Sequence, residues 1–71
     1  MDRDEIDHHL VIAGQHVADG ARHIEHQLRI IKDLQSGGHD TTQARQILET
    51  MKKGQAMHEE ERGRLTALLR S

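Results

Sequence analysis

Length, composition and charge exclude several classes of protein. The chain has 71 residues, enough for one small domain. It contains no cysteine, which excludes disulfides, Cys-x-x-Cys redox pairs and thiolate metal sites. It contains no Phe, Tyr or Trp on which single-stranded nucleic acid could stack, and its formal net charge of −2 argues against a basic DNA-binding patch. The unusual feature is the presence of seven histidines.

The first element predicted is a helix over about 3–36. Acidic residues, among them Asp2 and Glu5, crowd its start, where the helix dipole favours negative charge. Apolar residues then recur at steps of three and four, the spacing of one helix face. These residues are Ile6, Leu10, Ala13, Val17, Ala21, Ile24, Leu28, Ile31 and Leu34.

A turn is predicted over 37–40. Gly37 and Gly38 suit the left-handed conformation that ends many helices. Asp40 is expected to cap the next helix, with Gln43 three residues later as its capping-box partner. A turn this short makes the two flanking helices antiparallel neighbours.

The second helix is predicted over about 41–70, and its apolar face is interrupted. The face is apolar near the turn and again in the last turns, whereas its middle is polar. We interpret the polar residues Gln55, His58, Glu61 and Arg62 as a polar seam layer opposite small residues of the first helix. One interpretation is a hydrogen-bonded layer that sets register and oligomeric state, with Gln55 and Glu61 as partners of His58 and Arg62. The other is a site in which a carboxylate holds a histidine.

The predicted fold is an all-α antiparallel two-helix hairpin that forms a single domain. An isolated hairpin of this size has little core, and its apolar stripe is wider than one helix–helix seam requires. We therefore expect two hairpins to assemble as a homodimeric four-helix bundle. The expected core and dimer stripe consists of Leu10, Val17, Ile24, Leu28, Ile31, Ile47, Leu48, Met51, Leu65, Leu68 and Leu69.

The histidines support two interpretations. His9, His16 and His23 recur every seven residues and form one edge of the first helix, while His8, His26 and His39 are expected to face solvent. In the first interpretation, the row of histidines is a polar border beside the seam between the helices and has no ligand. The alternative is a metal site that uses His16, His23 and His58, with ligands from one or two subunits.

The pair His58-Glu59 resembles part of another dimeric helical hairpin. The dimerisation and phosphotransfer domain of sensor histidine kinases also carries a histidine followed by an acid. The family pattern His-Glu-x-x-(Thr/Asn)-Pro is not met here, because Arg62-Gly63 replaces its last two residues and no Pro occurs in the chain. Histidine phosphotransfer is therefore kept only as a minor alternative.

A second resemblance covers most of the chain. Its elements are His16-Val17-Ala18-x-Gly20-x-x-His23-Ile24-x-x-Gln27, the turn Gly38-His39-Asp40-Thr41-x-x-Ala44, and Met51-x6-His58-x3-Arg62-x-x-Leu65. This layout is similar to a group of short proteobacterial proteins, and the turn is its most specific part. The resemblance implies a helical hairpin in a bacterial cytoplasmic protein and carries over no catalytic residue.

The function expected from these patterns is that of a non-enzymatic interaction or assembly module. No arrangement of residues indicates catalysis, and no cofactor is expected. The longest apolar run has four residues, so no membrane span is expected, and the acidic start does not resemble a signal peptide. The expected partner is a second copy of the chain, with another protein as a further possibility.

Overall fold

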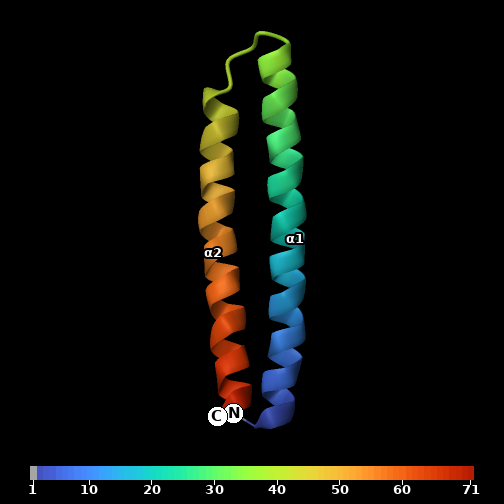
Figure 1. Ribbon diagram of the computed structural model, residues 1–71, viewed down its shortest axis with the longest axis vertical. Coiled ribbons are helices and arrows are strands. Elements are labelled where there is room, and N and C mark those ends of the chain that lie inside the picture. Colours follow the sequence, from blue (N-terminus) through green and yellow to red (C-terminus); the bar gives the residue numbers. More distant parts are fainter. Residues whose placement is uncertain (1) are drawn as a thin grey trace.

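The computed structural model describes residues 2–71, which form an antiparallel helical hairpin. Helix α1 spans Arg3–Ser36 and helix α2 spans Thr42–Arg70, within about one residue of the predicted bounds. The helices lie side by side along their whole length, with both chain ends at the end opposite the connecting loop (Figure 1). The hairpin measures 53 × 14 × 13 Å between its Cα atoms, so it is long and only one helix pair thick.

Both ends of α1 are capped by local hydrogen bonds. At the start, the Glu5 amide donates to Asp2 Oδ1 at 2.9 Å. At the end, the His39 amide donates to the Leu34 carbonyl at 2.9 Å and the Gly38 amide donates to the Gln35 carbonyl at 3.1 Å. This Schellman arrangement requires a left-handed residue, and Gly38 supplies it with φ of 74°.

The start of α2 differs from the predicted capping box. Thr41, rather than Asp40, is the N-cap residue, and its side chain makes no capping hydrogen bond. Asp40 Oδ1 instead accepts from the Thr42 amide at 3.0 Å and from the Thr42 hydroxyl at 2.7 Å. The aspartate therefore stabilises the turn before the helix, as Asp does in Asx-turns, and the expected partnership with Gln43 is wrong.

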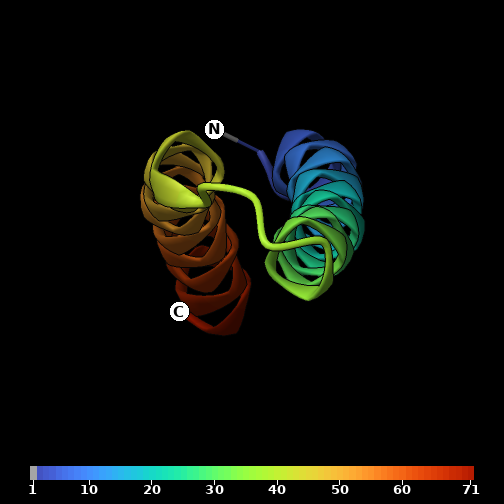
Figure 2. The same ribbon diagram turned by 90° about the horizontal axis from the view of Figure 1, so that it is seen from above.

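The seam between the helices follows alternating steps of four and three residues, the pattern of a coiled coil. Viewed along its length, the hairpin shows the two helices leaning in opposite directions, so that they wrap around each other (Figure 2). Two small apolar cores lie on this seam. Near the chain ends, Leu65 packs with Ile6 and Ala13. Near the loop, the buried cluster consists of Ile31, Ala44 and Leu48.

Two glutamines lie on the seam between and beside these cores. Gln27 is buried and donates from Nε2 to the Ala44 carbonyl at 2.9 Å. Gln55 donates from Nε2 to the Val17 carbonyl at 2.7 Å. Each side chain thus binds the main chain of the other helix, which ties the two helices into one register.

The apolar stripe expected from the sequence is only partly covered by the hairpin. Ile31, Leu48 and Leu65 are buried, while five members are half-buried: Leu10, Val17, Ile24, Met51 and Leu69. Leu28, Ile47 and Leu68 are exposed. A pair of helices encloses only the residues that point directly at the partner helix, so the flanking residues stay open to solvent.

Candidate functional site

The polar seam layer is smaller than the sequence suggests. Of its four predicted members, Gln55 alone lies half-buried on the seam of the hairpin, whereas His58, Glu61 and Arg62 are exposed. The prediction that Gln55 and Glu61 would partner His58 and Arg62 inside the seam is wrong for the hairpin. Long side chains at these seam positions reach solvent because one neighbouring helix cannot enclose them.

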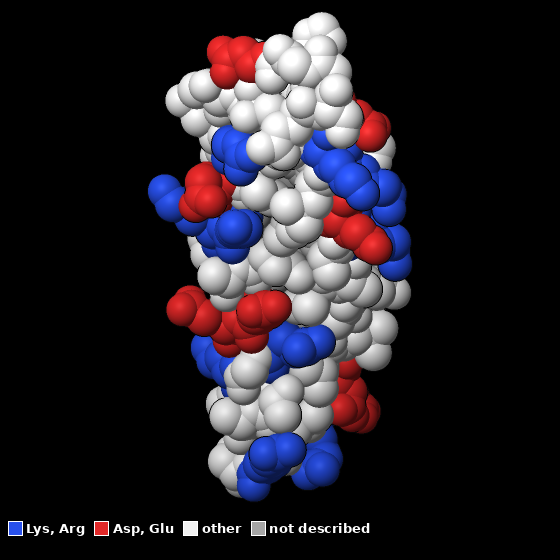
Figure 3. Space-filling model, turned by 45° about the horizontal axis from the view of Figure 1, so that its top comes forward, with Lys and Arg blue, Asp and Glu red and all other residues white. Residues whose placement is uncertain are grey.

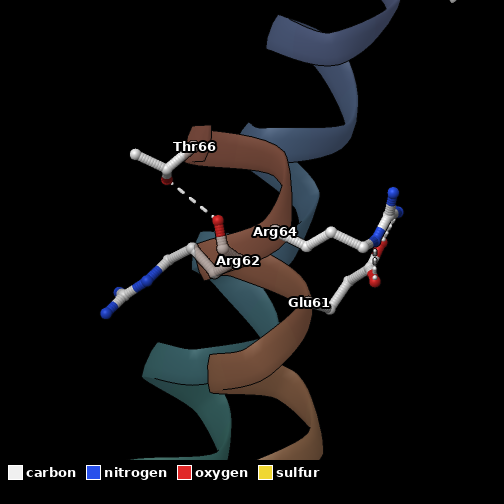
Figure 4. A network of polar contacts seen from close by, with 4 residues as sticks. All are labelled: Glu61, Arg62, Arg64 and Thr66. Carbon is white, nitrogen blue, oxygen red and sulfur yellow. Dashed lines mark hydrogen bonds and ion pairs between the residues drawn. The ribbon is translucent and has the colours of Figure 1, made fainter. Parts of the chain in front are cut away.

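Glu61 pairs along its own helix instead. Its carboxylate accepts from Arg64 Nη2 at 2.6 Å and from Arg64 Nε at 3.1 Å. These hydrogen bonds hold the pKa of the Glu61 carboxyl below its ordinary value, and the charge of His9 on α1 lowers it further. The Arg62 side chain extends on the other side of α2, and its main-chain carbonyl accepts from the Thr66 hydroxyl at 2.9 Å (Figure 4).

Two histidines from different helices lie next to each other. The ring centroids of His16 and His58 are 5.2 Å apart, with the ring planes inclined at 52°. His16 belongs to the row of histidines on α1 that also contains His9 and His23. We call this side of the hairpin the histidine edge, defined by His9, His16, His23 and His58.

The predicted three-histidine metal site is not assembled in the single hairpin. Across residues 2–71, no three His, Cys, Asp or Glu side chains lie where they could hold one ion together. His23 is seven residues from His16, which corresponds to roughly 10 Å along the helix. The hairpin therefore brings together two of the three residues, His16 and His58.

A second stripe runs along α1 outside the seam, and we call it the outer stripe. It lies about 100° around the helix from the seam. A charged residue lies near each end, a larger apolar residue lies inside each of these, and the centre contains three small residues and Glu25. Val11 and Leu28 are 61% and 49% exposed. A side chain at Gly14 would meet nothing within 4 Å. The outer stripe consists of Asp7, Val11, Gly14, Ala18, Ala21, Glu25, Leu28 and Lys32.

Other surface features are less specific. Basic and acidic side chains alternate over the face seen in Figure 3, with uncharged surface between them. The exposed large apolar residues of α2 are Ile47, Met57 and Leu68. A shallow furrow between Glu59, Arg62, Thr66 and Arg70 follows the last turns of α2 and opens to solvent. Neither described helix has an apolar stretch long enough to span a membrane.

Comparisons with protein-family models, with curated proteins and with solved structures gave no match to this chain.

Gln27 is the residue of the seam that reasoning from the sequence missed. Gln27 is not among the seam residues predicted from the sequence, yet it is buried and bonded to α2. The signal was its position, three residues after Ile24 and four before Ile31, where the stripe requires a seam residue. A glutamine can be buried at such a position when its amide finds a main-chain partner.

Proposed function

We propose that this chain is a non-enzymatic assembly module whose partner is a second copy of itself, joined through the outer stripe of α1. The observation that carries the proposal is the symmetry of that stripe. A two-fold axis between Ala18 and Ala21 would place these two alanines opposite each other in the two copies. It would also place Val11 of one copy against Leu28 of the other, and Asp7 against Lys32.

This pairing is self-complementary, as a two-fold interface requires. At each end of the interface, Asp7 of one copy would meet Lys32 of the other, so that opposite charges pair. One step closer to the centre, Val11 of one copy would meet Leu28 of the other. Glu25 would lie across from Gly14, where the absence of a side chain leaves room. Small residues at the centre permit the two α1 helices to approach closely, and each α2 then flanks the pair in a four-helix assembly.

The energetics favour covering this surface. Among residues 2–71 the hairpin buries six apolar residues, and chains this small need further core or a partner for stability. Full burial of a Val or Leu side chain contributes about 1.5–3 kcal/mol, and two-fold symmetry makes each such contact occur twice. The Asp7–Lys32 pairs are surface contacts that contribute little affinity but select the antiparallel orientation.

Molar mass measured by light scattering after size-exclusion chromatography tests the assembly. At tens of micromolar we expect twice the chain mass. Ala18→Glu places like charges at the centre of the interface and should weaken the dimer by at least about tenfold. Ala67→Glu is the matched control, because Ala67 is exposed on α2 away from the outer stripe, and it should remain dimeric. A monomeric parent chain, or equal dissociation by both variants, would overturn the proposal.

Cysteine cross-linking tests the orientation, since the chain has no cysteine of its own. In the antiparallel arrangement, Val11→Cys should form a disulfide only when mixed with Leu28→Cys. Two copies of position 11 would lie roughly 25 Å apart along the axis, too far for a disulfide. A parallel pair would instead cross-link Val11→Cys with itself, and this result would exclude the arrangement proposed.

A further inference from the structure

We propose that His16 and His58 form a two-imidazole binding site for a divalent late transition-metal ion, bridging α1 and α2 within one hairpin. The supporting geometry is the spacing of the rings. Zn–N bonds are about 2 Å long, so two imidazole centres on one tetrahedral ion lie about 5 Å apart. The His16 and His58 centroids are 5.2 Å apart, which matches this spacing.

The surroundings of this pair favour an exposed, two-ligand site. Both histidines are exposed, so an ion can enter from solvent and water can complete its coordination. Glu61 follows His58 by three residues, but Arg64 occupies its carboxylate at 2.6 and 3.1 Å. Imidazole ligands suit Cu²⁺, Ni²⁺ and Zn²⁺, whereas Mg²⁺ and Ca²⁺ prefer oxygen. The site should therefore discriminate strongly between these two groups of ions.

The consequence of such a site is a cross-link between distant parts of the chain. His16 and His58 are 42 residues apart and meet only when the hairpin is folded, so the bound ion stabilises the folded state. The histidine edge and the outer stripe lie on nearly opposite sides of α1. Metal binding is therefore independent of the proposed self-association, and one ion should bind per chain in monomer and dimer alike.

The test uses the untagged full chain, with ZnCl2 as probe and MgCl2 as the oxygen-preferring control. Thermal melts followed by circular dichroism should show a Tm that rises with Zn²⁺ and does not respond to Mg²⁺. His16→Gln and His58→Gln should each abolish most of this rise while leaving the metal-free Tm nearly unchanged. Because the two residues share one ion, the double variant should lose no more than either single variant.

His26→Gln is the matched control. It lies on α1, is exposed, and follows His23 by three residues, a spacing that can chelate an ion within one helix. It should keep the full Zn²⁺ response. Loss of the response in His26→Gln, or its retention in His16→Gln and His58→Gln, would place the ion elsewhere and overturn the proposal.

Two measurements on the unmodified chain avoid any effect of substitution on folding. Titration calorimetry should give one Zn²⁺ per chain, and a ratio of one ion per two chains would contradict a site within one hairpin. In NMR spectra, substoichiometric Cu²⁺ should broaden the ring signals of His16 and His58 before those of the other histidines. Simultaneous broadening of all seven would also contradict the proposal.

Discussion

The Gln55 side chain occupies the space that a side chain at Gly20 would need. A Cβ built on Gly20 would overlap Gln55 Oε1 and lie 2.8 Å from Gln55 Cδ. The Gln55 side chain is fixed in this position because its Nε2 donates to the Val17 carbonyl at 2.7 Å. Its Oε1 is buried and has no hydrogen-bond partner. The glycine on α1 and the glutamine on α2 therefore depend on each other sterically.

The first prediction concerns this pair. Alanine is favoured over glycine by about 1 kcal/mol inside a helix, so Gly20→Ala should stabilise the chain where space is open. In the parent chain, Gly20→Ala should lose this gain, because it displaces the Gln55 amide from its hydrogen bond. In a Gln55→Ala background the gain should return. Urea unfolding of all four chains should give a coupling energy of about 1 kcal/mol or more.

Gly63→Ala serves as the control for that experiment. Gly63 is helical, and a Cβ there would meet nothing within 4 Å. Gly63→Ala should stabilise the folded chain by about 1 kcal/mol, both in the parent chain and in the Gln55→Ala variant. Additivity of Gly20→Ala with Gln55→Ala would show that the two residues are not in contact.

A second prediction follows from the unpartnered oxygen. A buried acceptor without a hydrogen bond costs about 1–3 kcal/mol, and methionine resembles glutamine in shape without carrying that acceptor. Gln55→Met should therefore stabilise the chain by about 1 kcal/mol. Gln27→Met should stabilise the chain less than Gln55→Met does, because Gln27 donates to the Ala44 carbonyl and has no unpartnered buried atom. Denaturant midpoints at equal protein concentration compare the two, and a larger gain at Gln27 would contradict the assignment.

The third prediction concerns Leu65, which is 1% exposed and packs with Ile6 and Ala13. Truncation of a buried leucine to alanine costs about 2–5 kcal/mol, a large part of the stability of a small chain. Leu65→Ala should unfold much of the protein at 25 °C by circular dichroism. Leu68→Ala, at a residue 39% exposed, should cost far less at the same concentration. Equal losses would show that Leu68 is covered in the assembled protein.

The fourth prediction concerns acid. Hydrogen bonds from the Thr42 amide and, secondarily, from its hydroxyl lower the pKa of the Asp40 carboxyl below its ordinary value. A pKa lowered by folding means that this carboxylate stabilises the chain above its unfolded pKa of about 4. That contribution is lost as the pH falls through the lower folded value.

Asp40→Asn tests this assignment because asparagine keeps an acceptor in the turn but does not titrate. The stability difference between the parent and Asp40→Asn should be constant above about pH 5 and change only at lower pH. NMR titration should also show that Thr42→Val raises the pKa of Asp40 by removing the hydroxyl donor. An unchanged titration curve would mean that the hydroxyl does not bind the carboxylate in solution.

The amino-acid sequence alone determined the helices and their order. The steps of three and four from Ile6 to Leu34 define one helix face, and Gly38 ends α1 because it tolerates a positive φ. A short loop then requires antiparallel neighbours. These features are local, since each depends on residues within a few positions of one another, and so they can be read from the sequence.

The tertiary structure decided which polar residues lie inside. Gln27 and His58 both fall on seam positions, yet Gln27 is buried and His58 is exposed. The difference lies in what each meets across the seam: Gln27 reaches the Ala44 carbonyl, whereas His58 meets the ring of His16 at the open edge. Burial of a polar group depends on a partner from the other helix, and a repeating pattern within one helix carries no information about that partner.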